Sequence, residues 1–536
     1  MHDHLVGLLH KGEGRRGHLT RKKLKMSMAT LTSLPPQWLS IVAVFLLPIL
    51  TLLLFRGKDD NKKKGLKIPP GPGQLPFIGN LHQLSRQPYV DFWKMAKKYG
   101  PVVQLQLGRC PTVVLSSTET AKELMKDRDV ECCSRPLSVG PGQLSYNFLD
   151  VAFSPFSDYW REMRKLFISK LLSMRRVQSF RYAREEQMDK LIEILDGAYP
   201  NPVNLTEKVF NMMDGIIGTI AFGRTTYAQQ EFRDGFMKVL AATMDMLASF
   251  DAENFFPVVG KFIDYLSGAL AKRQRTFNNI DRYFQKVIEQ HLDPNRPKPE
   301  TEDIVDVLIG LMKDGSASFK ITGDHVKAIL MNVFVGGTDT SAVTITWAFS
   351  ELLKNPKLMK KAQEEVRNAV GPNKRRVEGK EVEKIKYIDC IVKETFRKHP
   401  PTPLLIPHFS MRHCKIGGYD IPPGSTIYVN AWAMGKDATI WDNPEEFYPD
   451  RFMNSEVDYR GSHFELVPFG AGRRICPGLA MATTAVKYIL ANLLYGWDYE
   501  MPEGQKFEDF PLIEEGGLSV HNKQDIMVIP EKHKWD

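Results

Sequence analysis

One cysteine stands at the end of a glycine- and arginine-rich stretch, residues 468–478, which reads "PFGAGRRICPG". Taken alone, a free cysteine is most often a small buried apolar side chain. The loop before Cys476 and the Pro477-Gly478 pair after it favour another interpretation, in which a thiolate binds a metal. The six cysteines of the chain show no paired spacing typical of a zinc site or a disulfide framework. If Cys476 binds a metal, it does so as the only protein ligand.

A second candidate site lies in a long apolar segment, residues 324–353, which reads "DHVKAILMNVFVGGTDTSAVTITWAFSELL". A helix that is apolar on all sides lies buried at the centre of a large protein. Two adjacent glycines, Gly336 and Gly337, and a buried acid, Asp339, are costly in such a helix. Two interpretations stay open. The stretch is either a satisfied cap or kink, or a helix opened locally so that Asp339 and Thr340 can meet a ligand.

Helical patterns dominate the chain, so both stretches are expected to be positioned mainly by helices. Helices are expected near residues 173–197, 205–222, 228–248, 268–291 and 357–370. Two strands are expected in "VVQLQL" and "TVVLSS", separated by a turn at 108–111, and further short strands follow Tyr499. The sequence therefore predicts a mainly α fold with small β sheets and a long central helix.

The net charge of +9 on this 536-residue chain is concentrated near its N-terminus. Residues 1–67 hold thirteen Lys or Arg against four Asp or Glu, so the charges of the remaining residues balance. We therefore expect no nucleic-acid partner.

Trp38 to Phe55 form an eighteen-residue run without charge, which is just long enough to cross a bilayer. The run is followed by "RGKDDNKKKG" rather than by a cleavage site, which favours an uncleaved anchor over a signal peptide.

These features predict four parts of the chain. They are a basic N-terminal extension (1–35), a transmembrane anchor helix (36–55), a basic and Pro-rich hinge (56–80) and one large domain (81–536). Basic residues flank the anchor on both sides and leave its orientation open. If translation begins at Met26 or Met28, the basic flank lies wholly after the span, which places the large domain in the cytosol.

Four separated stretches, "PFGAGRRICPG", "GGTDTS", "KETFRKHP" and "FYPDRF", together resemble the haem-thiolate monooxygenases, the cytochrome P450 family. The resemblance runs from about Leu66 to the C-terminus, and "SPFSDYWREMRK" and the Pro-rich hinge resemble most the plant microsomal branch that oxidises specialised metabolites. It implies the cytochrome P450 fold, with haem b buried between the long central helix and the Cys loop. It also implies that Cys476 is the proximal thiolate ligand of the iron, which favours cleavage of the O–O bond.

The same resemblance implies further residues that contact the haem. Trp160, Arg164 and Arg474 are expected to hold the haem propionates, because the arginine fork pairs well with carboxylates. His408 is expected to make a further propionate contact, and Phe469 is expected to cover the thiolate sulfur.

Two more roles follow from the resemblance. Asp339 and Thr340 are expected to be catalytic, because in this family the acid and alcohol of the central helix deliver protons to dioxygen. Glu394, Arg397 and Arg451 are expected to form a buried ion network behind the Cys loop, with a structural role. Phe396 and Lys398 depart from the usual leucines of the family, and we interpret them as packing variants.

The sequence thus predicts a monooxygenase that inserts one atom of O2 into an apolar plant specialised metabolite and reduces the other to water. Its electrons are expected to come from NADPH through a separate cytochrome P450 reductase, because the chain has no dinucleotide-binding pattern of its own. The expected location is the endoplasmic reticulum membrane, spanned once, with the catalytic domain in the cytosol. An oxidative cyclase, coupling enzyme or dehydratase of the same fold, or a non-catalytic haem protein, are the alternatives.

The substrate itself is left open among terpenoids, phenylpropanoids and alkaloids. Its pocket is expected to be lined by residues 132–153, by the central helix before Gly336, by residues 404–406 and by the segment near Leu518. Cys132 and Cys133, at the start of the first of these segments, are unusual for the family and are expected to alter the loop on the substrate side.

Overall fold

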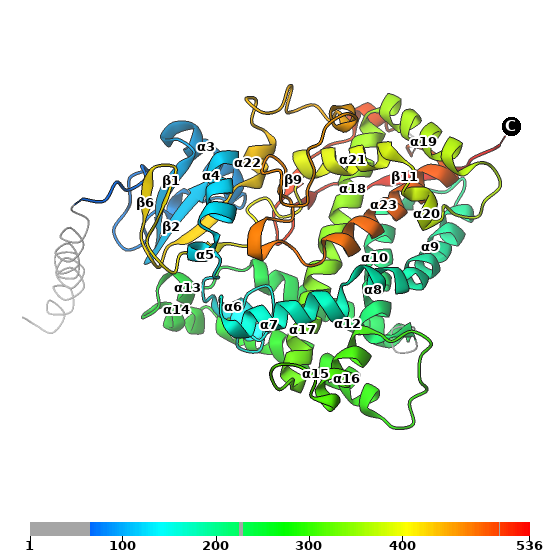
Figure 1. The fold of residues 1–536 in the computed structure, drawn as a ribbon. Helices are drawn as coiled ribbons and strands as arrows, with labels where there is room; N and C mark the ends of the chain where they lie inside the picture. The colour runs from blue at the N-terminus through cyan, green and yellow to red at the C-terminus, as the bar shows by residue number, and fades with distance from the viewer. Residues whose placement is uncertain (1–64, 225–228, 503, 536) are drawn as a thin grey trace, which may run out of the picture. The chain divides into compact units, whose positions relative to one another are not determined.

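The computed structural model describes residues 65–224, 229–502 and 504–535. The predicted N-terminal extension, the predicted anchor helix and residues 56–64 of the predicted hinge lie outside these ranges. The chain divides into two units between Leu66 and Lys67, and every element described below lies in Lys67–Asp536. This unit is mainly helical with small sheets, as predicted (Figure 1).

The helices form in the places that the apolar periodicity predicts. Their bounds are α3 (Pro88–Tyr99), α4 (Thr118–Lys122), α5 (Asp129–Cys132), α6 (Val139–Leu144), α7 (Asp158–Leu166), α8 (Met174–Ser179), α9 (Arg181–Asp196), α10 (Leu205–Phe222), α12 (Gln230–Ala248), α13 (Ala252–Phe255), α14 (Gly260–Leu266), α15 (Ala269–Leu292), α16 (Ile304–Asp314), α17 (Gly323–Gly337), α18 (Asp339–Lys354), α19 (Pro356–Val370), α20 (Gly379–Val382), α21 (Lys386–Lys398), α22 (Ala431–Gly435) and α23 (Leu479–Gly496). The helix predicted at 173–197 is two helices, α8 and α9, and the other four predicted helices are single.

The strands are short and form four small sheets. They are β1 (Val102–Leu107), β2 (Cys110–Leu115), β3 (Val203–Asn204), β4 (His408–Phe409), β5 (Cys414–Ile416), β6 (Tyr419–Ile421), β7 (Thr426–Val429), β8 (Trp497–Glu500), β9 (Glu514–Glu515), β10 (His521–Asn522) and β11 (Met527–Lys532). The largest sheet has the order β1-β2-β7-β4, in which β2 and β7 are parallel and the other pairs antiparallel. The predicted strand pair is confirmed as β1 and β2.

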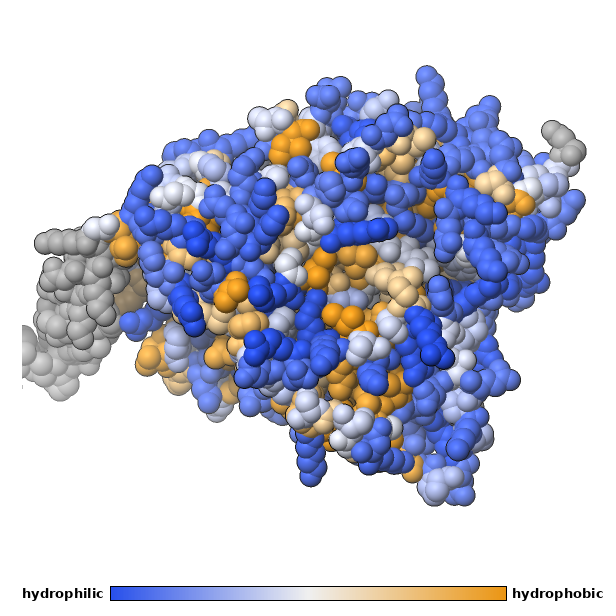
Figure 2. Space-filling model, viewed as in Figure 1, coloured by the Kyte–Doolittle hydropathy of each residue, from blue (hydrophilic) through white to orange (hydrophobic). Residues whose placement is uncertain are grey.

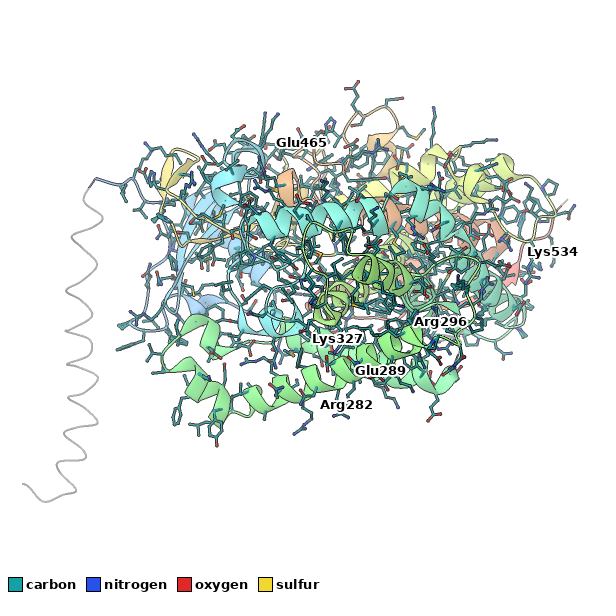
Figure 3. The ribbon with its side chains drawn as sticks, turned by 60° about the horizontal axis from the view of Figure 1, so that its bottom comes forward. Arg282, Glu289, Arg296, Lys327, Glu465 and Lys534 are labelled. Atoms are coloured by element: carbon teal, nitrogen blue, oxygen red, sulfur yellow. The ribbon has the colours of Figure 1, made fainter. Side chains whose placement is uncertain are left out.

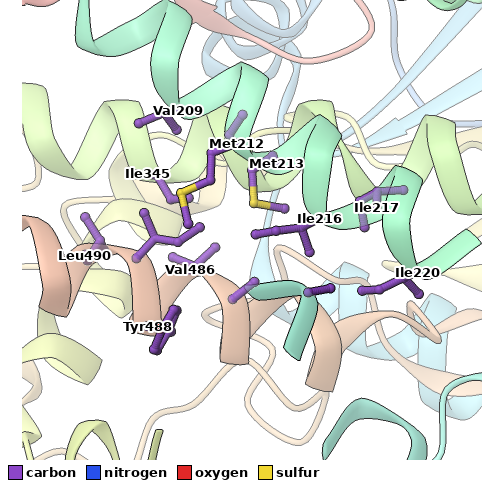
Figure 4. Packing of buried hydrophobic residues seen from close by; sticks show 14 of the residues in the cluster. Val209, Met212, Met213, Ile216, Ile217, Ile220, Ile345, Val486, Tyr488 and Leu490 are labelled. Carbon is purple, nitrogen blue, oxygen red and sulfur yellow. The ribbon is translucent and has the colours of Figure 1, made fainter. Parts of the chain in front are cut away.

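The core is built where α10 and α23 each pack against α18 (Figure 4). Met213 and Ile216 of α10 point toward α23, whose Val486 and Leu490 face them (Figure 4). Burying such side chains removes apolar surface from water, which is the main favourable term in folding. The three helices come from distant parts of the chain, so this packing fixes the central helix relative to the Cys loop.

Helix α15 shows how the outer helices attach to this core. Its buried side chains include Ile280, Phe284 and Val287, whose spacing places them on one helical face. Arg282 and Glu289 lie on the opposite, exposed face and project outward (Figure 3). The polar and apolar faces of α15 thus follow directly from its sequence.

The predicted central helix is broken at Thr338, which separates α17 from α18. Among the described residues, Gly323–Lys354 is the one helix long and apolar enough to cross a membrane, but 67% of its most apolar window is buried inside the protein. A helix buried in this way is a core helix. The predicted membrane anchor precedes the described residues.

Candidate active site

An internal cavity of about 260 Å³ lies between the central helix and the Cys loop. Cys476, Phe469 and Met481 contribute to one wall, and Gly336 and Thr340 of the central helix contribute to another. Its other lining residues are Arg135, Val151, Ala152, Arg164, Phe167, Leu172, Arg184, Met213, Ile216, Ile217, Ile220, Asn332, Val333, Gly337, Ser341, Pro401, Thr402, Leu405, Ile406, His408, Pro468, Gly470, Ala471, Arg474, Pro477, Gly478, Ala482 and Ala485. The two stretches singled out from the sequence therefore face one cavity.

The Cys loop is held by its own backbone. The amide of Cys476 donates to the carbonyl of Phe469 at 2.9 Å, which closes the loop. Gly472 has a φ of 65°, and a Cβ at this position would lie 2.2 Å from the carbonyl oxygen of Met125. Glycine is therefore required at residue 472 by its backbone conformation and by the approach of Met125.

Helix α23 begins at Leu479, with Gly478 as its N-cap. Pro477 precedes this cap and therefore lies outside the first turn of the helix. Burial raises the pKa of the Cys476 thiol, while the backbone amides of Gly478 and Leu479 and the charge of Arg164 act in the opposite direction. The amides at the helix terminus thus stabilise the charged sulfur, but in the protein chain alone burial raises the pKa of the thiol more than these amides lower it.

Phe469 packs against two aromatic rings, a cluster that the sequence did not indicate. Its ring lies 5.1 Å from that of Phe396 and 5.8 Å from that of Tyr459, both edge to face. Such edge-to-face pairs add to the stabilisation that burial gives. Phe396, a departure from the family pattern, therefore supports the residue that lines the cavity beside Cys476.

Trp160 and Arg474 meet at one edge of the cavity. Helix α7 starts at Asp158 because Ser157 caps it, accepting from the amide of Trp160 at 3.1 Å. The Trp160 Nε1 donates to the carbonyl of Val151 at 3.0 Å, and the indole is 2% exposed. Trp160 does not itself line the cavity, but it packs against Arg474, which does.

Three arginines line this edge. Arg474 donates to the carbonyls of Cys133 and Ser154 at 2.6 and 2.8 Å. Arg164 donates to the carbonyl of Ile475. Arg135 is not among the site residues that the sequence predicts. It donates to the carbonyls of Ala152, Ile406 and Pro407 at 3.1, 2.7 and 2.9 Å.

The partners of these arginines are carbonyl oxygens, and none of the three is in an ion pair within the described part of the chain. Burial lowers the pKa of Arg135, Arg164 and Arg474, the last to about 10, because each charge has left water. Buried positive charges need anionic partners. A ligand with two carboxylates, such as haem, fits this edge, and the single thiol of Cys476 fits as its metal ligand.

His408 lies at the same edge, as expected, but in a neutral state. Burial and the charges of Arg135 and Arg474 lower its pKa to about 3. Its Nδ1 lies 3.2 Å from the carbonyl oxygen of Cys132, and because a carbonyl only accepts, Nδ1 carries the proton. In the neutral ring Nε2 is then an acceptor, so a contact with a propionate requires a protonated His408.

The two glycines of the central helix have different surroundings. A Cβ on Gly336 would meet no atom within 4 Å, and this residue faces the cavity. A Cβ on Gly337 would lie 2.8 Å from Ile217, so this glycine lets α17 approach α10 closely. The Thr340 hydroxyl donates to the carbonyl of Gly336 at 2.8 Å. The prediction of a buried acid is wrong for Asp339, which is half-buried beside the break.

The ion network expected behind the Cys loop is present. Arg397 pairs with Glu394 through two bonds of 2.8 Å, and both residues are at most 1% exposed. Arg451 Nε lies 3.1 Å from the same carboxylate. Arg397 also donates to the carbonyls of Gly435 and Pro444 at 2.6 and 2.7 Å. This arginine therefore joins α21 to the end of α22 and to the loop that contains Pro444.

Two details of the predicted substrate pocket differ from expectation. Leu518 is not among the residues that line the cavity. The side chains of Cys132 and Cys133 are buried away from it, and the sulfur of Cys132 lies 3.4 Å from that of Cys414 in β5. The two cysteines reach the site only through their backbone carbonyls, which accept from His408 and Arg474.

Comparisons with known proteins agree with this geometry. The family model described as Cytochrome P450 matches residues 69–528. A 2-methylbutanal oxime monooxygenase of Manihot esculenta is 90% identical over 511 residues, which are 95% of this chain and 100% of that protein. A 4-hydroxyphenylacetaldehyde oxime monooxygenase of Sorghum bicolor is 51% identical over 516 residues, which are 94% of this chain and 97% of that protein.

A solved structure shares the fold. A zebrafish cytochrome P450 determined with progesterone superimposes with a TM-score of 0.72 at 24% sequence identity. The match covers 83% of this chain and 99% of that chain. At this level of identity the similarity concerns the arrangement of helices and sheets, not the substrate.

Proposed function

The chain belongs to the cytochrome P450 family, and we propose that it oxidises a small aliphatic aldoxime. It is a monooxygenase of plant specialised metabolism with a haem held by a cysteine thiolate, as the sequence predicted. The observation that carries the proposed substrate is the 90% identity with the Manihot esculenta enzyme over 511 residues. The proposed aldoxime is none of the three classes, terpenoids, phenylpropanoids and alkaloids, among which the sequence left the substrate open.

The lining of the cavity supports a small apolar substrate. Val333, Gly336, Leu405 and Ile406 line the cavity together with Thr340, and their side chains offer no charge. Of the four arginines that line the cavity, Arg135, Arg164 and Arg474 lie at the edge assigned to the haem carboxylates, and Arg184 donates to the carbonyl of Val177. An uncharged oxime with a short alkyl chain is therefore compatible with the apolar wall.

We assign the haem contacts to residues of the Cys loop and of the arginine edge. Cys476 is the proposed iron ligand, and Arg135, Arg164 and Arg474 are proposed to hold the two propionates. Trp160 keeps Arg474 in place. A thiolate-bound haem, when present, supplies the reductive activation of O2. Phe469 keeps water from the sulfur by its position between Cys476 and the aromatic cluster.

Thr340 and Asp339 are proposed to supply protons on the opposite side. The Thr340 Oγ1 donates to the Gly336 carbonyl in the protein alone. When this bond is exchanged for one to the reacting oxygen, the hydroxyl can pass on a proton that Asp339, half-buried beside it, replaces from solvent.

The use of a redox partner and of O2 follows from the family, and we propose that the partner is a NADPH-dependent cytochrome P450 reductase. Each turnover uses one O2, two electrons and two protons and releases one water with the oxygenated product. A chain that contains no dinucleotide-binding pattern must receive both electrons from another protein.

We further propose a location at the endoplasmic reticulum membrane, with residues 36–55 as the anchor. Apolar side chains are exposed in residues 258–266, which include α14, among them Val258 at 80%, Phe262 at 64% and Leu266 at 67%. Figure 2 shows the face of the protein on which α14 lies. Monomeric soluble proteins seldom expose apolar patches of this kind, and such patches are frequent where a protein meets a membrane. In sealed microsomes, added protease is expected to degrade the large domain and to leave a lumenal control intact.

The proposed reaction is tested with the reconstituted enzyme. The full chain, a NADPH-dependent reductase and NADPH are supplied with 2-methylbutanal oxime or with 4-hydroxyphenylacetaldehyde oxime under isotopically labelled O2. We expect label in the product and more product per NADPH from the aliphatic oxime. A protein with an intact thiolate–haem spectrum that converts neither oxime would refute the proposed substrate class.

A further inference from the structure

We infer that Asn332 is a positioning residue that ties the central helix to the arginines of the haem edge, an inference that rests on the proposed haem site. Asn332 lies on α17 and lines the cavity. It precedes Gly336 by one turn and Thr340 by two, so all three share one helical face. Its side chain nevertheless makes no contact toward the reacting side and turns to the segment 150–154.

Both ends of the Asn332 amide are used. Its Oδ1 accepts from the backbone amides of Val151 and Ala152 at 2.9 and 3.1 Å. Its Nδ2 donates to Oδ2 of Asp150 at 2.8 Å. Asp150 is fully buried, and its carboxylate also accepts from the amide of Phe153 at 3.0 Å. Asn332 of the central helix thereby fixes the backbone amides of this segment.

The carbonyl side of the same segment holds the haem edge. The carbonyl of Val151 accepts from Trp160 Nε1 at 3.0 Å and from Arg474 Nη1 at 3.4 Å. The carbonyl of Ala152 accepts from Arg135 Nε at 3.1 Å. The positions of the two arginines, and of the tryptophan that packs against Arg474, therefore depend on a segment whose own position depends on Asn332.

The chemistry of the site favours asparagine over its nearest substitutes. A leucine would leave two backbone amides and a buried carboxylate without their partner, which is costly. An aspartate would satisfy the amides but would place a second carboxylate against Asp150. Asparagine alone among residues of this shape offers an acceptor to the amides and a donor to the carboxylate.

The consequence is a link between the substrate side of the cavity and the charged edge of the haem. A displacement of α17 at Asn332 would move Val151 and Ala152, and with them the donors that face the propionates. We therefore expect Asn332 to control how tightly the haem is held and how much positive charge faces it, without touching the haem itself.

The test compares two buried asparagines in the holoenzyme. Asn492 on α23 accepts from the amide of Val377 at 2.8 Å and donates to the carbonyl of Tyr488 at 2.8 Å, but it does not line the cavity. Asn332→Leu and Asn492→Leu both lose side-chain bonds to backbone and should both lower Tm. The measured quantities are the rate of haem transfer to an excess of a high-affinity acceptor protein and the ferric–ferrous midpoint potential.

For Asn332→Leu we expect haem transfer about tenfold faster than in the wild type, as the loss of one to two net hydrogen bonds implies. We also expect a lower midpoint potential, because less positive charge faces the haem carboxylates. For Asn492→Leu, which is remote from the cavity, the transfer rate should stay within about twofold. Equal rates in the two variants, or an unchanged rate in Asn332→Leu, would overturn the inference.

If Asn332→Leu does not fold, Asn332→Ala is used for the same two measurements, because it removes the same hydrogen bonds without adding bulk. Wild-type rate and potential in Asn332→Ala would overturn the inference in the same way. The proposed haem site fails separately. A wild-type protein without a thiolate–haem spectrum refutes that site, whereas a normal spectrum with no effect of either Asn332 variant refutes only the role of Asn332.

Discussion

The guanidinium carbon of Arg474 lies 3.9 Å from the ring centroid of Trp160. Arg474 comes from the Cys loop and Trp160 from α7, so this stacked pair joins two elements that are distant in the sequence. A cation over an indole face is favourable, the more so when the pair is withdrawn from water. The pair holds a positive charge at the edge of the cavity without neutralising it.

Replacing Trp160 should separate its two contributions. Trp160→Phe keeps an aromatic face under Arg474 but loses the bond from Nε1 to Val151, and should cost about 1 kcal/mol of unfolding free energy. Trp160→Ala also empties a buried site, and should cost about 3–5 kcal/mol. Denaturant unfolding measures both, and the haem content after purification should fall in the same order. Equal stability of the two variants would show that the indole face has no role.

Cys476 should be the one cysteine whose loss removes the thiolate signature. In Cys476→Ala, the reduced protein with carbon monoxide should lack the red-shifted Soret band of a thiolate-bound haem. Cys110→Ala is the matched control, because Cys110 is half-buried in β2 and does not line the cavity. Persistence of the red-shifted band in Cys476→Ala would exclude Cys476 as the ligand.

The sequence predicts the fold well where local pattern decides. The helices α10, α12, α15 and α19 begin and end within about two residues of their predicted bounds, since their apolar periodicity is undisturbed. The split of 173–197 into α8 and α9 was missed, because the interruption at Phe180 carries no glycine or proline.

The site is predicted only in part, because its remaining residues act through tertiary contacts. Arg135 and Asn332 carry no spacing signal, and their partners are backbone groups of 151–152 and 406–407 and the carboxylate of Asp150. Asp339 is half-buried rather than buried because the helix breaks beside it. Such long-range backbone pairing cannot be read from residue type, whereas Cys476 and its loop can.

Thr340 should control how efficiently electrons are used. Thr340→Ala removes the hydroxyl that lies against the cavity and donates to Gly336, so product per NADPH should fall severalfold while peroxide rises. Thr340→Ser keeps a hydroxyl within reach of the same carbonyl and should retain most of the coupling. The measurement is product, NADPH and peroxide in the reconstituted system. Unchanged coupling in Thr340→Ala would remove Thr340 from the proton route.

Arg397 should be required for stability rather than for chemistry. Arg397→Met removes the buried guanidinium that holds Glu394 through two bonds and leaves this carboxylate with Arg451 alone as its cation, so it should cost about 3–5 kcal/mol of unfolding free energy. Arg397→Lys should also be strongly destabilised, because an ammonium cannot reach Glu394 and the carbonyls of Gly435 and Pro444 together.

The control for Arg397 is a surface arginine. Arg460 lies 3.9 Å from Asp458 with its side chain 74% exposed, and Arg460→Met should change the unfolding free energy by less than about 1 kcal/mol. Denaturant unfolding of the three variants measures the difference. If Arg397→Met were as stable as Arg460→Met, the network behind the Cys loop would not be a stabilising element.

His408 should make the protein less stable in acid. Burial and the charges of Arg135 and Arg474 lower its pKa to about 3, whereas an unfolded histidine titrates near 6.5. Below about pH 6.5 the unfolded chain therefore takes up a proton that the folded chain does not. The unfolding free energy should fall by up to about 1.4 kcal/mol per pH unit down to about pH 3, and stay constant above about pH 7. His408→Gln should remove this part of the slope. A wild-type holoenzyme that instead gains stability relative to His408→Gln on acidification would show a protonated His408 paired with a haem propionate.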